Sequence, residues 1–417
     1  MALSWKSFHA KKALDLTHLQ HMLTPEDVFV TDGYPEHTYV AFQAGQKEAE
    51  LRDGLSQRNK IISISGPSKS GKTTLCDRVF GTDKGVSRIY VTGDAVSKNE
   101  DLWLEAYRQI TDDTDRPFYE CSQTERIEKL IAKDIPLVID DFHYIPRDVQ
   151  PRIAQQMKNA ASAGLRIICL SVPHRGDDPI RNNTDLAGRF FSVTFDFWTD
   201  DDLTEIAATG FPLVGFPSVP DFNGLLAREA LKSPQIMQTL CLEACRAQDL
   251  DTPLEMAQPS AALLPEIKRR TVRSYNHATA LQLLSQGPPT RGSERLEYRL
   301  SAGGGADVYE CLLEALRQDP PFLHLSLDEV RVRVRNLLVD DKEPNIRSAL
   351  QQYDALFKDQ TPPLDWDDEK RRLTVVDPHF YFYLRSTTRT GPSIPPNRVP
   401  EALLPGLEAT EEPPSVS

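Results

Sequence analysis

The chain has 417 residues, a formal net charge of −13, and a composition that is 40% hydrophobic and 26% charged. These values are ordinary for a folded protein of two or three domains, and the negative charge argues against non-specific coating of nucleic acid or of an anionic membrane. The six cysteines are scattered without a C-x-x-C pair, so neither a zinc site nor a disulfide framework is indicated.

The N-terminal region, residues 1–30, is predicted to be a helical extension. Its stretch SFHAKKALDLTHLQHML has the pattern of an amphipathic helix that docks on the body or recruits a partner. His18 and His21 are three residues apart, and we expect a helix surface there rather than a metal site. The region lacks the apolar core of a signal peptide. No apolar run approaches the roughly 20 residues that span a bilayer, so we expect a cytoplasmic protein with no membrane partner.

Residues 61–75, IISISGPSKSGKTTL, carry the first chemical motif. A short apolar strand enters a turn that fits G-x-x-x-x-G-K-[ST] without a gap. The glycines let the backbone curl so that successive N–H groups converge on an anion, and the following helix adds its positive dipole end. Lys72 would reach the β- and γ-phosphates of ATP, and the Thr73 hydroxyl would ligate Mg²⁺. The residues predicted to bind the nucleotide here are Gly66, Ser68, Lys69, Ser70, Gly71, Lys72, Thr73 and Thr74.

A second apolar strand, residues 135–139, ends in two carboxylates. We expect Asp140 to hold Mg²⁺, directly or through water, and Asp141 to activate water for hydrolysis. The alternative for Asp141 is that it caps the next helix. Aspartate is shorter than the glutamate often found at this place, which favours slow hydrolysis.

The surrounding pattern predicts an α/β fold with a parallel sheet. Apolar strand segments alternate with amphipathic helical segments, so helices should cover both faces of the sheet. The strand segments cover residues 60–65, 87–96, 135–140, 165–173 and 192–197. Ligands of such sheets bind at the carboxyl ends of the strands. Ser171 lies at one such end and, with His174, would sense the γ-phosphate; a plain structural role is the alternative for both.

Residues 199–290 are predicted to form a helical lid over the nucleotide. Thr199 and Asp202 carry a capping signature ahead of an apolar helix face, and residues 221–248 supply more helix. Cys241 and Cys245 lie four residues apart there, and we expect both to be small buried apolar side chains.

Breaker-rich stretches at residues 285–293 and 301–306 mark a boundary. Three amphipathic helices and two short strands around a charged tip follow, which predicts a winged helix. The tip carries Lys370, Arg371 and Arg372, which would contact DNA phosphates. The acidic stretch DWDDE directly before them cancels much of their field, so we favour a protein-facing or autoinhibitory domain over a DNA reader.

The sequence therefore predicts an α/β P-loop NTPase with a helical lid and a C-terminal winged helix. Its last segment is rich in proline and acidic residues and is predicted to be disordered. The predicted boundaries are an N-terminal extension at 1–30, a P-loop NTPase domain at 31–198, a lid at 199–290, a winged helix at 291–390 and a tail at 391–417.

These motifs together resemble bacterial STAND-type ATPases, which are switch ATPases related to the AAA+ class and to origin-recognition initiators. The likeness covers roughly residues 28–385 and rests on a G-x-P-x-x-T-Y-V stretch at residues 33–40, the loop GPSKSGKT, and the stretches LVIDDFHYI, LAGRFFSVTFDF and DPHFYFYLR. Beside this resemblance, an aromatic and a β-branched residue upstream of the loop, Tyr39 and Val40, would close over adenine. Ordinary packing against the sheet is the alternative.

The resemblance also implies arginines near the phosphates. Arg189 precedes the last strand, where an arginine of AAA+-like proteins contacts the γ-phosphate from a neighbouring subunit or within the chain and stabilises developing charge. A surface salt bridge is the alternative. The AAA+ pattern often has an arginine after a proline at the start of a lid helix, but here Pro234 is followed by Gln235. This departure favours slow hydrolysis or a mainly nucleotide-gated switch.

The leading hypothesis is an ATP-driven switch. ATP with Mg²⁺ would close the lid, move the winged helix, and permit self-association or binding of an effector or sensor protein; slow, partner-stimulated hydrolysis would reset it. The resemblance implies a role in bacterial signalling or antiviral defence against phage. The alternative is a DNA-binding initiator or loader ATPase. A small-molecule kinase is a third reading, which the absence of a compact acceptor-binding lid disfavours.

Overall fold

The computed structural model describes the chain in ranges separated by gaps. The described residues are 23–81, 88–97, 101–110, 121–146, 148–172, 189–248, 253–289, 295–339, 342–357 and 362–387. The predictions for His18, His21 and His174, and for the tail from residue 391, lie outside these ranges.

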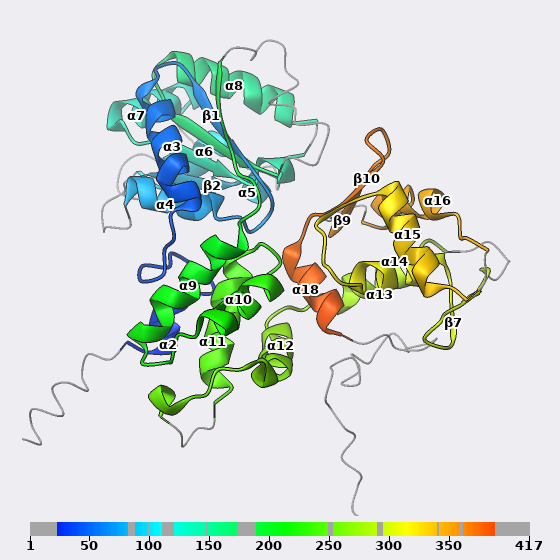
Figure 1. The fold of residues 1–417 in the computed structure, drawn as a ribbon. Helices are drawn as coiled ribbons and strands as arrows, with labels where there is room; N and C mark the ends of the chain where they lie inside the picture. The colour runs from blue at the N-terminus through cyan, green and yellow to red at the C-terminus, as the bar shows by residue number, and fades with distance from the viewer. Residues whose placement is uncertain are drawn as a thin grey trace, which may run out of the picture. The chain divides into compact units, whose positions relative to one another are not determined.

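The contacts within the chain define two compact units (Figure 1). We call residues 32–206 together with 233–235 the sheet unit, and the rest of the chain the helical unit. Helix α9 (Asp200–Leu213) begins in the first and ends in the second. It is capped as predicted, because the Thr199 hydroxyl accepts a hydrogen bond from the Asp202 backbone N–H at 3.1 Å. None of the helices in the described ranges has the length and hydropathy that crossing a membrane would need.

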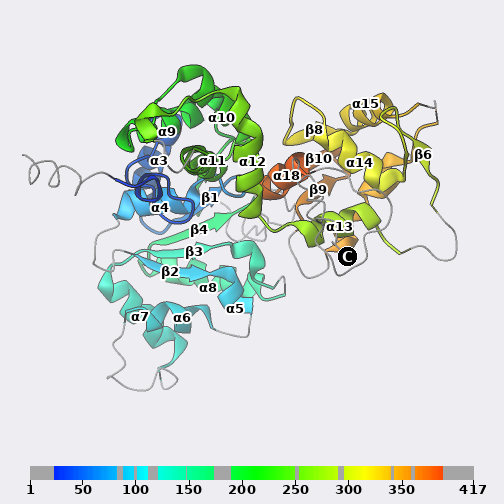
Figure 2. The same cartoon turned by 90° about the horizontal axis from the view of Figure 1, so that it is seen from below.

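Five parallel strands form the sheet, as predicted. The strands are β1 (Ile61–Ser65), β2 (Ile89–Thr92), β3 (Leu137–Asp140), β4 (Ile167–Ser171) and β5 (Phe190–Thr194). Their order is β2-β3-β4-β1-β5, with every neighbouring pair parallel, and Figure 2 shows β2, β3, β4 and β1 side by side. The predicted second strand was too long, because the chain turns at Gly93 into helix α5 (Gly93–Ser97).

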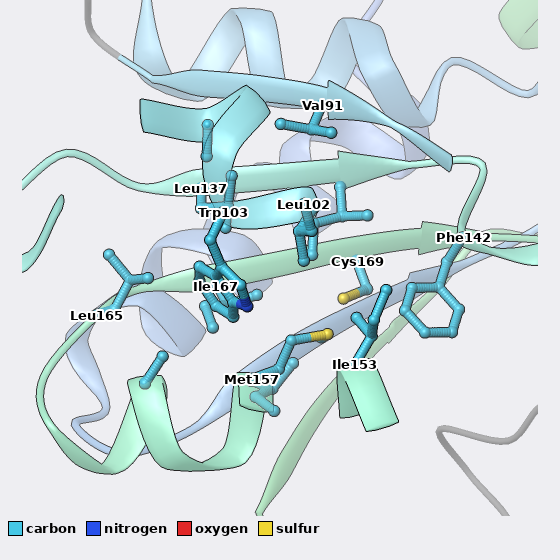
Figure 3. Packing of buried hydrophobic residues seen from close by; sticks show 14 of the residues in the cluster. Val91, Leu102, Trp103, Leu137, Phe142, Ile153, Met157, Leu165, Ile167 and Cys169 are labelled. Atoms are coloured by element: carbon cyan, nitrogen blue, oxygen red, sulfur yellow. The ribbon is translucent and has the colours of Figure 1, made fainter. Parts of the chain in front are cut away.

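One face of the sheet packs on helices that bury a large apolar cluster. The helices are α6 (Leu102–Arg108), α7 (Gln123–Lys133) and α8 (Gln150–Ser162). Figure 3 shows Trp103 and Met157 packed beside Ile167 and Cys169. The strands contribute every second residue to this cluster, for example both Ile89 and Val91 from β2.

The residues between these strand positions project to the opposite face, as strand geometry requires. Helix α3 (Gln46–Ser56) packs on helix α4 (Lys72–Phe80) and on β1 and β5. The short helices η1 (Phe42–Gly45) and η3 (Phe142–Tyr144) precede α3 and follow β3. Alternate side chains of each strand thus lie on opposite faces of the sheet. One face is apolar, and the other carries polar groups at the strand ends.

The first part of the helical unit contains short and medium helices. They are α2 (Pro25–Val28), α10 (Pro220–Glu229), α11 (Pro234–Arg246), η5 (Leu254–Met256), η6 (Ala261–Leu263), α12 (Leu264–Arg273) and α13 (Ala278–Gln286). The N-terminal segment packs here, because Glu26 pairs with Arg246 at 2.9 Å and the rings of Phe29 and Phe211 are 5.3 Å apart. Cys241 and Cys245 are buried in α11, as predicted.

The second part of the helical unit combines helices with a small antiparallel sheet of order β8-β10-β9. Its elements are β6 (Tyr298–Arg299), β7 (Gly305–Ala306), α14 (Val308–Arg317), β8 (His324–Ser326), α15 (Leu327–Leu337), α16 (Ile346–Leu350), α17 (Tyr353–Leu356), β9 (Leu364–Asp367), β10 (Arg372–Val375) and α18 (Pro378–Ser386). The predicted hairpin is β9–β10, whereas β8 was missed. The predicted third helix is divided into α16 and α17.

Helix α18 connects the two parts of the helical unit. It packs on α12, α13 and α14. The ring of Tyr275 stacks on His379 of α18 with centroids 4.2 Å apart, and its hydroxyl donates a hydrogen bond to Thr239 of α11 at 3.0 Å. Residues of the predicted lid and of the predicted C-terminal domain therefore pack in one compact unit.

Candidate nucleotide-binding site

The loop between β1 and α4 has the backbone geometry that its sequence predicts. Gly71 caps α4 in the left-handed region with φ 91°, and Lys69 also has a positive φ of 61°. A Cβ on Gly66 would lie 2.4 Å from the Cβ of Phe195, so only glycine fits there. The Gly66 N–H donates a hydrogen bond to the Ser171 carbonyl at 3.3 Å, which joins the loop to the end of β4.

The Lys72 side chain is folded into this loop. Only 7% of its surface is exposed, and its Nζ donates hydrogen bonds to the carbonyls of Gly66 at 3.1 Å and Pro67 at 2.7 Å. Burial lowers the pKa of Lys72 to about 8, although Asp140 and Asp141 act in the opposite direction. A buried ammonium whose partners are neutral carbonyls is strongly stabilised by an anionic partner such as a phosphate.

Asp140 joins three elements at the carboxyl edge of the sheet. Its Oδ2 accepts hydrogen bonds from the Thr73 hydroxyl at 2.8 Å and from the Tyr90 hydroxyl, and its Oδ1 accepts one from the Asp141 backbone N–H at 2.8 Å. Burial and the Asp140 charge raise the pKa of Tyr90, so its hydroxyl remains a donor. The predicted pair, Thr73 and Asp140, is therefore in direct contact.

This donor set suits Mg²⁺. A hydroxyl and a carboxylate are hard oxygen ligands, and Mg²⁺ is usually bound by one or two such groups together with substrate phosphates. Within the described ranges, no group of three or more His, Cys, Asp or Glu residues could hold a metal without that help. Thr73 and Asp140 would thus hold the ion together with a bound triphosphate.

Asp141 lies beside this pair in a left-handed conformation with φ 50°. It is the N-cap residue of η3, although its side chain makes no capping hydrogen bond there, and the role in activating water stays a prediction. Burial, followed by the Asp140 charge, raises the pKa of Asp141 to about 6. A carboxylate whose pKa lies closer to neutrality is better suited to take a proton from water.

Two buried hydroxyls at the loop have no hydrogen-bond partner within the described residues. They are the Oγ atoms of Ser70 and Ser171. A buried hydroxyl without a partner is costly, and both lie at the loop that the anion would enter. This observation fits a ligand with several acceptor oxygens.

The predicted adenine contacts lie upstream and are packed against protein. The Tyr39 hydroxyl donates to Glu48 Oε1 at 2.6 Å, and its ring stacks on Tyr34 at 5.7 Å. The guanidinium of Arg78 lies 5.1 Å from the Tyr39 ring centre, and Val40 is buried. These contacts agree with the packing alternative, and contact with adenine stays a prediction.

Arg189 lies at the wrong end of the sheet for a phosphate contact within its own chain. Its carbonyl accepts a hydrogen bond from Ile61 N–H at 2.9 Å, at the start of β1, whereas the loop follows the end of β1. Its guanidinium donates to the Ser162 hydroxyl. The within-chain version of the prediction is therefore wrong, because parallel pairing puts the starts of β1 and β5 together. Contact with a neighbouring subunit stays a prediction.

Three residues at the site were missed by the sequence reasoning. Tyr90 bonds to Asp140, and the Trp198 indole N–H donates to the Ser70 carbonyl at 2.9 Å. Gly93 approaches the Asp141 carbonyl so closely that a Cβ there would lie 2.3 Å from its oxygen. Side chains alternate along a strand, so residues 90 and 92 of β2 lie on the same face of the sheet as residue 140 of β3. This alternation was the signal that could have placed Tyr90 near Asp140.

The sheet and the site together define the class of the protein. The loop strand β1 lies between β4 and β5, and the acidic strand β3 ends at the same edge as the loop. A glycine-rich loop with lysine and threonine at that edge, opposite an aspartate, makes this an α/β P-loop NTPase fold, as predicted.

Comparison with solved structures finds proteins of partly similar shape. Cdc6p from Pyrobaculum aerophilum is 12% identical with a TM-score of 0.42, over 86% of this chain and 97% of that one. A Walker-type ATPase of Pyrococcus abyssi is 13% identical with a TM-score of 0.46, over 82% and 96%. Drosophila ORC bound to DNA is 14% identical with a TM-score of 0.38, over 86% and 90%. These scores are low, so the fold assignment rests on the sheet order and the loop.

No family model matches the sequence, and no curated protein matches it either. The resemblance to STAND-type ATPases accordingly remains a prediction from the motifs.

Proposed function

We propose that the chain binds ATP with Mg²⁺ and hydrolyses it slowly. The observation that carries this proposal is the contact of Thr73 with Asp140 at the edge where Lys72 is folded into the glycine loop. The ion would neutralise phosphate charge during phosphoryl transfer. Lys72 would exchange its carbonyl partners for phosphate oxygens, Ser70 and Ser171 would donate to them, and Asp141 would orient and deprotonate the attacking water.

Calorimetry with ATP, with and without Mg²⁺, tests this proposal. We expect wild-type protein to bind ATP, and Lys72→Ala to bind at least tenfold more weakly because it loses a charge-assisted bond to phosphate. Lys133→Ala is the matched control, since Lys133 is an exposed lysine at the end of α7. An absence of heat with wild-type protein, or equal affinity in Lys72→Ala, would refute the assignment.

We further propose that nucleotide state controls self-association or binding of a protein partner, which is the role of a switch in signalling or phage defence. The packing of α11, α12 and α18 in one unit supports this proposal. A lid that follows the nucleotide would carry the C-terminal elements with it. Particle mass should then change when a non-hydrolysable ATP analogue is added, and Lys72→Ala should not respond. An unchanged monomer in every condition would contradict the switch.

We propose that α14 to β10 form a winged helix that faces protein rather than DNA. Two of its cations, Arg347 and Lys370, are paired with carboxylates of the same unit. Arg347 of α16 makes two hydrogen bonds to Asp368 at 2.9 and 2.7 Å, and the side chains of Gln351 and Trp366 also donate to Asp368. Lys370 pairs with Asp367 at 2.8 Å. A phosphate would have to displace these partners.

Duplex DNA binding at several salt concentrations distinguishes the two interpretations. A protein-facing winged helix should show no specific binding and no dependence on the wing cations. Salt-dependent binding that the Lys370/Arg371/Arg372→Ala variant loses would instead support the initiator-like alternative.

A further inference from the structure

We propose that Tyr90 is a positioning residue that holds Asp140 in the orientation needed to bind Mg²⁺. This inference rests on the proposed ATP and Mg²⁺ site and adds a residue that no P-loop motif contains. The Tyr90 hydroxyl donates to Oδ2 of Asp140, the same oxygen that accepts from Thr73. One carboxylate oxygen is thus held from the loop side by Thr73 and from the sheet side by Tyr90.

Strand pairing brings Tyr90 to this position. Thr92 of β2 is directly opposite Asp140 of β3, and Tyr90 is opposite Val138. Because side chains alternate along a strand, Tyr90 and Asp140 are diagonal neighbours on one face, within reach of a long aromatic side chain. A shorter residue at position 90 would not span that diagonal.

The backbone of Tyr90 is fixed as well. Among the strands that the structure describes, β2 is at the edge of the sheet, where backbone groups lack a neighbouring strand. The side chain of Gln109, just after α6, takes that place: its Oε1 accepts from the Tyr90 N–H at 2.9 Å, and its Nε2 donates to the Tyr90 carbonyl at 2.6 Å. A hydroxyl on so constrained a residue is a rigid support for a ligand carboxylate.

The three hydrogen bonds to Asp140 differ in what they can do when the ion binds. The bond from the Asp141 N–H fixes Oδ1. The Thr73 hydroxyl is itself a predicted ligand, so its oxygen would turn toward the ion. Among the described residues, Tyr90 is then the side chain that still holds Oδ2 and stops the carboxylate from rotating. Partners of this kind commonly change metal affinity by about 10- to 100-fold.

The test is the Mg²⁺ dependence of ATP binding in Tyr90→Phe, followed by calorimetry or with a fluorescent ATP analogue. We expect the Mg²⁺ concentration for half-maximal effect to rise about tenfold, and the affinity for ATP in the presence of a chelator to stay unchanged. Gln109→Ala, which keeps the hydroxyl but frees the backbone, should shift the Mg²⁺ dependence in the same direction by less. Thermal unfolding of each variant confirms that it is folded.

Tyr107→Phe is the matched control, because Tyr107 lies in α6 and its hydroxyl accepts from Lys129 at 2.7 Å, away from Asp140. It should leave the Mg²⁺ dependence unchanged. An unchanged dependence in Tyr90→Phe would overturn the inference, and so would tighter Mg²⁺ binding, which would mean that Tyr90 competes with the ion. Wild-type protein that binds no ATP in either condition would overturn the proposed function and this role with it.

Discussion

Replacement of Gly93 by alanine tests the geometry of the site most directly. The new Cβ would lie 2.3 Å from the Asp141 carbonyl oxygen and 3.1 Å from its carbonyl carbon. Ordinary contact begins near 3.4 Å, so one backbone must move by roughly 1 Å, and neither is a flexible side-chain end. Gly93 begins α5 and Asp141 precedes η3, so the movement changes the end of β3.

The expected effects separate stability, binding and chemistry. Overpacking of this kind costs about 1–3 kcal/mol of the free energy of unfolding. A displacement near 1 Å at the water-activating carboxylate lowers ATP turnover by about 100-fold. ATP affinity should change little, because the loop from Gly66 to Thr73 supplies most phosphate contacts. Thermal unfolding, calorimetry and a phosphate-release assay measure the three quantities.

Gly224→Ala is the control for this experiment. Gly224 lies inside α10, and a Cβ there would meet only Arg228 Nη1, at an ordinary 3.6 Å. Alanine is the better helix former, so this change should stabilise the protein by up to about 1 kcal/mol. A Gly93→Ala protein with wild-type melting temperature and wild-type turnover would show that the close approach of Gly93 to Asp141 is not a constraint.

Three other outcomes follow from single side chains. Gly66→Ala should weaken ATP binding and lower the melting temperature, because its Cβ would meet Phe195 at 2.4 Å; calorimetry with unchanged affinity would contradict this. Arg333→Met should lower the free energy of unfolding, measured in urea, by about 2–3 kcal/mol, because the buried guanidinium donates to carbonyls at the end of α14. A decrease below about 0.5 kcal/mol, the size expected for a surface substitution, would contradict this role. Burial, with a smaller effect of Arg372, holds the pKa of His324 below its ordinary 6.5. The unfolded chain therefore binds this proton more readily, and stability should fall as pH drops below 6.5; if His324→Gln shows the same pH dependence in thermal unfolding, this explanation fails.

The parts of the site that sequence could predict are those that a local pattern encodes. The glycine loop has a fixed residue spacing, and an apolar strand that ends in carboxylates is a local pattern, so Lys72, Thr73 and Asp140 could be proposed from the sequence as site residues. Their contact follows from the parallel sheet, because both motifs end strands at the same edge.

The predictions that were wrong or incomplete concern the place and pairing of a strand in the sheet rather than its composition. Arg189 precedes its strand, which in a parallel sheet places it at the amino end, and the pairing of β1 with β5 shows this arrangement; the phosphate contact was expected from the resemblance and not from the strand order. Strand β8 has three residues and no clear alternation, so its pairing with β10 was invisible before folding. Tyr90 was read as one residue of an apolar strand: alternation places it on one face of its strand, but its hydrogen bond to a residue 50 positions away depends on the register of β2 with β3.

The two hydrogen bonds from Lys72 to backbone carbonyls affect which ligands the loop favours. They already solvate the charge, so a molecule that enters the crevice gains most from this lysine when its own anionic oxygens are close enough to replace both. A nucleoside offers no anionic oxygen for this exchange, so preference for phosphorylated ligands would come from the resting arrangement of one side chain.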